Sequence, residues 1–562
     1  MPINVIDDPR VQELTGPGQM MEIEEREIRG QRLRTWRNAP SSLRAVLDFS
    51  LAHGDKDFIV YEDERWSFDR HYKAVASVAT WLVEDAGVRK GDRVALAMRN
   101  YPEWSIAFWA AAITGAIVVP LNAWWTGDEL EYGLRDSGSK ALIADIERYE
   151  RAEPHLKSLG IDHVVIAKAD APKGTVSIDT LIEREVAGPP DVQIDPEDDA
   201  TIFYTSGTTG FPKGALGTHR NICTNLFNLM YGAVSRGVGA AAPSAPDPDA
   251  PRPCQLLSVP FFHVTGCHST LCSTLAFGTK LVLMYRWDAE RALELIERER
   301  ITSFGGVPTM VWQVLESPNF AKRDTSSVQS IGYGGAPAPP ELLKRINEHF
   351  PNVGAGNGYG MTETSSLAVG NGGADYQRKP DSVGRPAPVN DIMIADDEGN
   401  EVPTGELGEV LMRGPNVVKG YWNKPEATAE TFRDGWLHSG DIGRVDGEGF
   451  LYIVDRAKDM VIRGGENIYS VEIETVLYEH PAVSEAAVVG IPHQVLGEEV
   501  AAVVKRVPGS DVTEQDLKDH VSNRLAAFKV PVRIEIVDDE LPRNPAGKIL
   551  KRELRDKLVA NA

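Results

Sequence analysis

The chain has 562 residues, of which 42% are hydrophobic and 25% are charged, and its formal net charge at pH 7 is −23. This composition is typical of a globular protein with a large buried core. The excess of negative charge argues against nucleic acid as a partner and against a broad anionic membrane surface, because both require basic patches.

The N-terminal residues are polar and acidic, so they lack the apolar segment of a signal peptide. Residues 1–40 are predicted to form an arm with little core of its own. Leu33 and Trp36 could dock this arm on the rest of the protein. The cysteines have no metal-ligand spacing and predict reduced thiols in a cytoplasmic protein. They are Cys223, Cys254, Cys267 and Cys272.

The longest apolar run, residues 106–121, is too short to span a membrane and is interrupted by Thr114, Gly115 and Pro120. It predicts a buried helix, a glycine turn and a short buried strand, and no integral membrane association. From residue 41 to residue 455, strand-like runs such as "RVALAM", "KALIAD" and "TIFYTS" alternate with helical stretches. Such alternation predicts layered α/β sheets in one large domain, residues 41–455.

Two segments of this domain predict loops, a linker over residues 187–200 and an Ala/Pro/Asp-rich exposed loop over residues 237–254. "QLLSVPFFHV" (255–264) predicts a strand, and so do the runs that follow it. After Pro386 the strands become shorter and are separated by glycine turns, which indicates a small barrel or an array of hairpins. Residues 456–562 combine two or three strands with three helices and predict a separate small α+β domain.

The stretch "TSGTTGFPKG" (205–214) follows the buried strand "ATIFY" and therefore leaves the end of a sheet, where α/β proteins place ligands. Glycines uncover backbone N–H groups, and hydroxyls and a lysine add donors, so the loop suits a nucleotide triphosphate. It is not a Walker loop, because Lys213 is followed by Gly214 where a hydroxyl would be required. The predicted phosphate cradle is Thr205, Ser206, Gly207, Thr208, Thr209, Gly210 and Lys213.

Seven motifs in one order make the chain similar to the adenylate-forming (AMP-binding) superfamily, in its acyl-CoA synthetase branch. They are "YTSGTTGFPKG", "FFHVTG", "GYGGAP", "NGYGMTE", "WLHSGDIG", "DRAKDMVIRGGENIYSVEIE" and "NPAGKILKREL". The resemblance covers nearly all of the chain beyond the arm. It implies a large domain of layered α/β sheets with a small β-barrel-like part, followed by a small mobile C-terminal domain.

The resemblance also implies the reaction. A carboxylate joins the α-phosphate of ATP with release of pyrophosphate, and the thiol of coenzyme A then attacks the acyl-adenylate, giving acyl-CoA and AMP. Mg²⁺ would be held by Thr205 and Glu363, hard oxygen ligands that suit this ion. Further ATP-binding residues implied are Gly335, Ala336, Pro337, Gly358, Tyr359, Gly360, Met361, Thr362, Asp441, Arg456 and Lys548, with Tyr359 stacking on adenine and Asp441 accepting from the ribose hydroxyls.

By the same resemblance Lys548 bridges carboxylate and α-phosphate during adenylation, and Lys458 is the hinge about which the small domain turns between the two half-reactions. His263 lies at the acyl end, where an ionised carboxylate needs orientation and charge stabilisation rather than a base. The expected acid pocket is His263, Thr265, Gly266, Val307, Gly334 and Gly358, and the expected coenzyme A contacts are Arg463, Gly464, Gly465 and Lys529.

The identity of the acid is open at this point. Ile462 stands where plant coumarate ligases carry a lysine, and the small residues Thr265, Gly266 and Gly334 suggest a roomy pocket for a fatty or bulky arylalkanoic acid. The alternatives are an acyl-AMP ligase that loads a carrier protein, a luciferase-like oxygenase and a non-catalytic nucleotide-binding scaffold. The set Lys213, Glu363, Asp441 and Lys548 argues against a scaffold. Both a monomer and a homodimer are compatible with the sequence.

Overall fold

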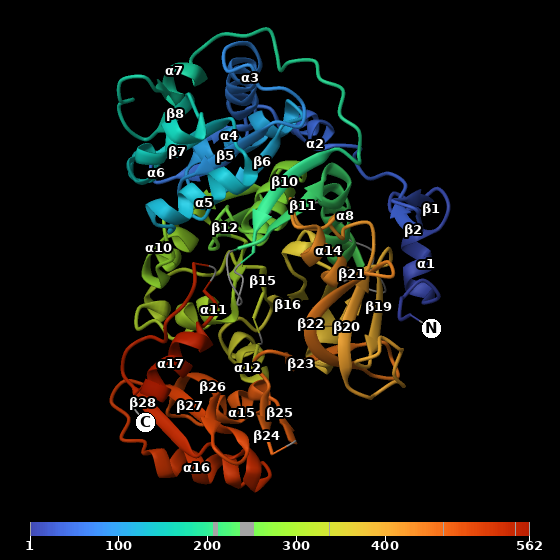
Figure 1. Ribbon diagram of the computed structural model, residues 1–562, viewed down its shortest axis with the longest axis vertical. Helices are drawn as coiled ribbons and strands as arrows, with labels where there is room; N and C mark the ends of the chain where they lie inside the picture. The colour runs from blue at the N-terminus through green and yellow to red at the C-terminus, as the bar shows by residue number, and fades with distance from the viewer. Residues whose placement is uncertain are drawn as a thin grey trace.

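The computed structural model describes residues 2–205, 212–235, 252–336, 338–464, 466–545 and 547–560. Figure 1 shows a large body and, at its lower end, a smaller body coloured orange to red that contains the C-terminal elements. Within the described residues the strands form two large sheets, two five-stranded sheets and one two-stranded hairpin. The predicted α/β architecture is confirmed. No helix in these ranges is long and apolar enough to cross a membrane.

The first large sheet has seven strands in the order β11-β10-β6-β5-β7-β8-β9, and all neighbours are parallel except β10 and β11. Its central parallel strands read as continuous apolar runs because both faces are covered. The strands are β5 (Arg93–Ala97), β6 (Ile117–Pro120), β7 (Ala141–Asp145), β8 (His163–Ala167), β9 (Val176–Ser177), β10 (Asp199–Tyr204) and β11 (Gly214–Thr218). The helices are α3 (Phe68–Glu84), α4 (Pro102–Ile113), α5 (Gly127–Ser137), α6 (Ile146–Leu159) and α7 (Ile178–Ile182).

The second large sheet has nine strands in the order β18-β17-β16-β15-β14-β12-β13-β3-β4, with a parallel centre and antiparallel edges. Its strands are β3 (Asp57–Tyr61), β4 (Glu64–Ser67), β12 (Cys254–Leu257), β13 (Lys280–Leu283), β14 (Ser303–Gly306), β15 (Ser330–Gly334), β16 (Gly354–Tyr359), β17 (Val369–Gly372) and β18 (Arg385–Pro386). The α-helices are α2 (Leu43–Phe49), α8 (His219–Ser235), α9 (Cys272–Ala276), α10 (Ala289–Glu299), α11 (Pro308–Leu315), α12 (Pro340–His349) and α13 (Gly373–Arg378). Short turns of helix are η1 (Ser50–His53), η2 (Thr265–Leu271), η3 (Phe320–Lys322) and η4 (Thr362–Thr364).

Helix α4 joins the two large sheets into one core. It contacts β5 and β6 of the first sheet and β3 of the second, and all of its residues are buried. Trp104 stacks on Phe261 from the second sheet's side, with 4.9 Å between ring centroids. The apolar run that was predicted as helix, glycine turn and strand is confirmed, with Gly115 in the left-handed region at φ 70°. The run "QLLSVPFFHV" was predicted as one strand, but β12 ends at Leu257 and a turn leads into η2.

The third sheet is the part predicted as a small barrel or hairpin array. Its antiparallel order β19-β20-β22-β21, with β23 beside β22, is an open array among the described strands. Figure 1 places it beside β16 and above the C-terminal body. Its elements are β19 (Asp391–Ala395), β20 (Gly408–Arg413), α14 (Pro425–Thr431), β21 (Phe432–Arg433), β22 (Trp436–Val445) and β23 (Leu451–Arg456).

The C-terminal body has a five-stranded sheet, β25-β24-β27-β26 with β28 beside β27, and its own apolar core. The sequence predicted two or three of these strands and overlooked the short hairpin β24–β25. Its elements are β24 (Val461–Arg463), β25 (Glu466–Ile468), α15 (Ser470–Tyr478), β26 (Val483–His493), β27 (Gly497–Arg506), α16 (Glu514–Ser522), η5 (Ala527–Lys529), β28 (Arg533–Val537) and α17 (Lys551–Ala560).

The N-terminal arm contains α1 (Pro9–Thr15) and the antiparallel hairpin β1 (Ile23–Ile28)–β2 (Gln31–Trp36), which the sequence analysis did not predict. Trp36 is 2% exposed, and its indole N–H donates to Asn228 Oδ1 on α8 at 2.9 Å. Ile3 pairs in an antiparallel bridge with Ile392 of β19. The arm is therefore docked on the large body through both the third sheet and α8.

Candidate active site

A cavity of about 740 Å³ lies at the carboxyl ends of the parallel strands β12, β14, β15 and β16. Side chains from the β10–β11 connection, the third sheet and the C-terminal body complete its walls. It brings together most of the predicted site residues. These are Thr205, Lys213, His263, Thr265, Val307, Gly334, Gly335, Gly358, Tyr359, Gly360, Met361, Thr362, Glu363, Asp441, Arg456, Lys458 and Lys548.

Asp441 is a buried carboxylate in the wall of the cavity, with 5% of its surface exposed. It lies in β22 directly opposite Arg456 of β23, whose Nε is 3.2 Å from its Oδ1. The Tyr359 hydroxyl donates to Asp441 Oδ2 at 2.6 Å. Burial raises the pKa of Tyr359 far above its usual value, so the hydroxyl keeps its proton. The cavity thus presents an aromatic ring beside a carboxylate, the pair expected for adenine and ribose.

Glu363, in η4, is the second buried carboxylate, and it is 5% exposed. It accepts a hydrogen bond of 2.6 Å from the Tyr421 hydroxyl, and burial raises the pKa of its carboxyl group. Lys213 Nζ lies 5.0 Å from the centroid of the Tyr421 ring, within cation–π range. The Thr205 N–H donates to the Lys213 carbonyl at 2.9 Å and closes the base of the predicted phosphate loop.

The oxygen ligands available here fit a magnesium ion that takes most of its ligands from phosphate. Glu363 and Thr205 offer hard oxygens, which Mg²⁺ prefers. Across the described ranges no group of three or more His, Cys, Asp or Glu residues could hold a metal ion by itself. An ion bound here would therefore need oxygens from the nucleotide and from water.

Lys548 reaches the cavity from the C-terminal body, on the turn before α17. Its N–H donates to Asn544 Oδ1 at 3.0 Å, and its carbonyl accepts from the Asn544 N–H at 2.8 Å. Gly547 has φ 83°, and a Cβ there would lie 2.7 Å from Val307, so only glycine lets the turn approach the large body this closely. A Cβ at Gly335 would lie 3.8 Å from Lys548 Cε.

The protonation state of Lys548 depends on the groups around it. Burial lowers its pKa to about 8, with a further contribution from Arg456, while Asp441 and Glu363 act in the opposite direction. Lysine readily changes its pKa when it is buried. A nearby anion such as phosphate would raise this pKa and favour the ammonium form.

His263 is held in the turn that follows β12. Its N–H donates to the Pro260 carbonyl at 3.1 Å, and its carbonyl accepts from the Cys267 N–H at 2.9 Å. Burial lowers the pKa of the imidazole to about 4, and the charge of Lys548 adds to this effect. The ring is therefore neutral at pH 7, and it can orient a carboxylate by a hydrogen bond without adding charge.

The floor of the cavity is a glycine surface that the sequence analysis recognised only at Gly334 and Gly358. Gly305, Gly332, Gly356 and Gly372 are neighbours in register across β14 to β17, and a second row contains Gly334, Gly358 and Gly370. All of them line the cavity. A Cβ at Gly332 or Gly370 would meet no atom within 4 Å, so this face of the sheet is bare and open.

Two glycines that were expected to widen the acid pocket have another role. A Cβ at Gly266 would lie 2.1 Å from the Pro260 carbonyl oxygen, and Gly266 is not among the lining residues. The prediction that it faces the acid is wrong, because its missing side chain allows close backbone packing. Gly334 does line the cavity, but a Cβ there would lie 2.3 Å from the Gly358 carbonyl oxygen. It too is required by the packing of strands.

The residues expected to bind coenzyme A lie apart from this cavity in the structure. Arg463 Nε is 2.7 Å from Glu499, and Lys529 Nζ is 2.6 Å from Glu472. Of the predicted site residues that the structure describes, Ala336, Arg463, Gly464 and Lys529, like Gly266, are not among those that line the cavity. Ser206, Gly207, Thr208, Thr209, Gly210, Pro337 and Gly465, and nearly all of the predicted loop 237–254, lie outside the described residues.

Sequence reasoning missed Tyr421 and the contribution of the arm. Tyr421 belongs to "KGYW" (419–422), where Gly420 has φ 145° and two aromatic side chains stand in a connecting segment. Aromatic residues in such a segment were a usable signal for a ligand site. Val5, Asp8, Arg10 and Val11 of the arm line the end of the cavity, and no sequence signal pointed to them.

The chain is similar to known proteins in both sequence and structure. Residues 48–422 match the AMP-binding enzyme family, and residues 472–548 match the AMP-binding enzyme C-terminal domain. A feruloyl-CoA synthase of an Amycolatopsis species is 38% identical over 483 residues, which cover 86% of this chain and 92% of the relative. A long-chain-fatty-acid–CoA ligase of Mycobacterium tuberculosis is 37% identical over 495 residues, covering 87% and 92%. The solved structure of an anthranilate CoA ligase in complex with anthranoyl-AMP superposes with a TM-score of 0.82 at 28% identity, covering 93% of this chain and 98% of the other.

Proposed function

The chain belongs to the AMP-binding enzyme family and is an AMP-forming acid–CoA ligase, and we propose that its substrate is a fatty or arylalkanoic acid that is activated in the cavity of the large body. One relative is named for a long-chain fatty acid and another for ferulate. In the first half-reaction a carboxylate oxygen of the acid attacks the α-phosphorus of ATP and pyrophosphate leaves. In the second, the sulfur of coenzyme A attacks the acyl carbon and AMP leaves.

The position of Lys548 carries the proposal. Acid and ATP are both anions, so their reacting oxygens repel one another unless a cation lies between them. Lys548 enters the cavity from the C-terminal body beside Gly335, with Asp441 and Glu363 near enough to affect its pKa. An ammonium group held there before the reaction stabilises the charge that develops between carboxylate and α-phosphate.

The remaining residues divide between the two ends of the nucleotide. Tyr359 and Asp441 would bind adenine and ribose, the carboxylate accepting from the ribose hydroxyls in place of the Tyr359 hydroxyl. Lys213 would neutralise the outer phosphates. Thr205 and Glu363 would hold Mg²⁺, which supplies further positive charge at the phosphates when it is bound. Neutral His263 would orient the carboxylate of the acid.

The second half-reaction requires a different arrangement of the C-terminal body. With Lys548 in the cavity, Arg463 and Lys529 are paired with Glu499 and Glu472, away from the reacting atoms. Lys458 follows β23, at the start of the segment that joins the two bodies. Rotation of the chain there would withdraw Lys548 and bring the β24–β25 hairpin towards the acyl-adenylate. The coenzyme A contacts at Arg463, Gly464, Gly465 and Lys529 belong to that second arrangement.

We further propose a cytoplasmic location for the enzyme. All four cysteines are buried and free in the structure. Unpaired thiols in a chain of this kind are typical of a reducing compartment.

The direct test is a panel of acids that includes decanoate, palmitate, ferulate, phenylpropionate and benzoate. We expect acid-dependent ATP–pyrophosphate exchange without coenzyme A, and AMP together with the acyl thioester when coenzyme A is added. Exchange without thioester formation would indicate an acyl-AMP ligase that loads a carrier protein. Absence of exchange with every acid would contradict the enzymatic assignment.

A further inference from the structure

The N-terminal arm lines the end of the cavity away from Lys548. The arm residues at this end are Val5, Asp8, Arg10 and Val11, and they lie with Arg385 of β18 and with Phe450 in the turn between β22 and β23. Helix α1 packs on α8 of the large body, so this wall is a separate chain segment laid across the edge of the second sheet. Nothing in the reaction described above requires such a wall.

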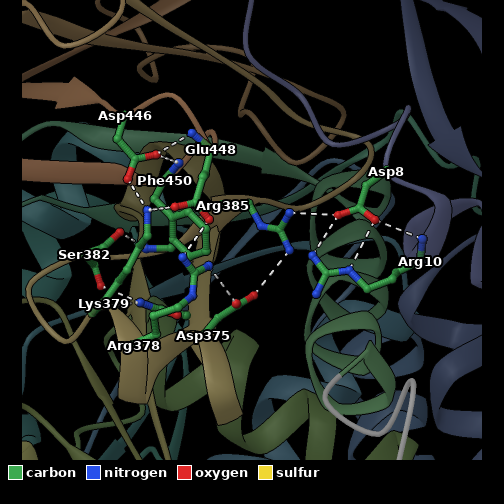
Figure 2. A network of polar contacts seen from close by, with 12 residues as sticks. Asp8, Arg10, Asp375, Arg378, Lys379, Ser382, Arg385, Asp446, Glu448 and Phe450 are labelled. Atoms are coloured by element: carbon green, nitrogen blue, oxygen red, sulfur yellow. Dashed lines mark hydrogen bonds and ion pairs between the residues drawn. The ribbon is translucent and has the colours of Figure 1, made fainter.

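Asp8 links the arm to the second sheet through an ion pair with Arg385, as Figure 2 shows. Its Oδ2 lies 2.9 Å from Arg385 Nη1, and also 2.9 Å from Arg10 Nη2. Its Oδ1 accepts from the backbone N–H of Arg10 at 2.9 Å, so the same carboxylate caps the N-terminus of α1. These contacts, first of all the hydrogen bond from Arg10, hold the pKa of Asp8 well below its usual range. Asp8 therefore remains charged throughout the working pH range.

Arg385 is fixed independently of the arm. Its Nη2 lies 3.4 Å from Asp375 of α13, and its guanidinium carbon is 5.2 Å from the centroid of the Phe450 ring. Arg378 and Lys379 lie over the same ring and pair with Glu448, which extends the network to the turn between β22 and β23 (Figure 2). The arm is thus one removable partner of an arginine that two other elements hold in place.

The distance from the reacting end to this wall is set by the strands. One cross-strand row of the second sheet contains Gly334, Gly358, Gly370 and finally Arg385. Gly334 adjoins Gly335, which lies beside Lys548. The row therefore begins next to the reacting groups and ends at the Asp8–Arg385 ion pair. Three strand spacings separate Gly334 from Arg385, which places the ion pair about 14 Å from the start of the row. An acid whose apolar tail extends beyond this distance would have to displace water from the Asp8–Arg385 ion pair, which costs free energy.

We propose that α1 is the end wall of the acid subsite, and that the Asp8–Arg385 ion pair is a specificity-determining contact that limits the length of the acid. This inference rests on the proposed function, because it assigns the glycine floor to the tail of the activated acid. An acid that ends on the floor fits with the arm docked. A longer acid requires the arm to yield, and the ion pair opposes that movement.

Two variants of Asp8 separate the ion pair from the helix cap. Asp8→Asn keeps a good N-cap acceptor but removes the charge, whereas Asp8→Ala removes both. The measurement is kcat/KM for straight-chain acids from hexanoate to stearate. We expect Asp8→Asn to raise the ratio of long-acid to short-acid kcat/KM about two- to fivefold, the change that one partly exposed ion pair supports. Asp8→Ala should raise it at least as much.

The matched control is Arg32→Ala, which removes the exposed Arg32–Glu25 pair of the β1–β2 hairpin in the same arm. Its acid-length profile should be that of the wild type. Hydrogen exchange of residues 9–15 reports whether the arm itself has loosened. Faster exchange in Asp8→Asn with an unchanged length ratio would show that the ion pair only stabilises the arm, and would overturn the proposal. An equal change of profile in Arg32→Ala would overturn it as well. If the wild type activates no acid at all, the proposed function fails instead.

Discussion

Lys548 allows a prediction with a defined magnitude, because its pKa lies within the range in which enzymes are assayed. Burial disfavours the ammonium form and lowers the pKa to about 8, and Arg456 adds to this effect. The proposed chemistry requires the charged form, which offsets the repulsion between carboxylate and triphosphate. The rate of adenylation is therefore expected to be highest at low pH and to fall as the pH rises through about 8.

The size of the effect follows from the titration of one group. With a pKa of about 8, roughly nine-tenths of Lys548 is charged at pH 7, half at pH 8 and about one-tenth at pH 9. The kcat/KM for ATP–pyrophosphate exchange, which reports the free enzyme, should fall about tenfold between pH 7 and pH 9. Exchange is measured without coenzyme A, so ionisation of its thiol does not contribute. Bound anions raise the pKa, and the fall in kcat should appear at higher pH.

A matched substitution identifies the titrating group. In Lys548→Arg the guanidinium cannot lose its proton, so the alkaline fall should disappear from this range even if the altered geometry lowers the rate. A fall near pH 8 that persists in Lys548→Arg would assign the titration to another residue. It would refute the reasoning that links burial of Lys548 to the pH profile.

Three further predictions concern residues around the cavity. Tyr421→Phe removes the hydrogen bond to the buried Glu363 and should raise the Mg²⁺ concentration for half-maximal adenylation about tenfold; an unchanged Mg²⁺ dependence would separate Tyr421 from the metal site. Gly370→Val places a side chain in open space on the glycine floor and should lower kcat/KM for long acids more than for short ones; equal loss for all acids would show that the floor does not contact the tail. Lys458→Pro fixes φ and removes a backbone donor, so thioester formation should fall about tenfold or more while pyrophosphate exchange is retained; normal turnover with coenzyme A would exclude this residue as the hinge.

The sequence was sufficient for elements whose pattern reflects their own burial. "RVALA" and "ALIAD" are apolar throughout because both faces of the first sheet are covered, and they form β5 and β7 as predicted. The polar hairpin β1–β2 gave no such pattern, because its strands are rich in charged residues and much of its surface is exposed. The hairpin β24–β25 was too short to be recognised.

Features of the site that depend on distant chain segments could not be predicted. Asp8 and Arg385 are 377 residues apart in the sequence, and neither has a neighbouring motif that marks it. The glycines of the floor come from four separate strands and become one surface only through the register of β14 to β17. At Gly266 the residue type suggested space for a ligand, but the backbone of Pro260 occupies the space that a side chain would need. A glycine in a sequence does not distinguish these two uses.

The most direct test of the account separates the two half-reactions in Lys548→Ala. Acyl-adenylate formation should slow by about 10²–10³, the usual cost of removing an electrostatic contact made in the transition state, while ATP affinity changes little. Supplied with synthetic acyl-adenylate and coenzyme A, the same variant should form the thioester at close to the wild-type rate, because Lys548 has left the site in that step. Parallel loss of both half-reactions would contradict the proposed cycle and assign Lys548 to folding or to coenzyme A binding.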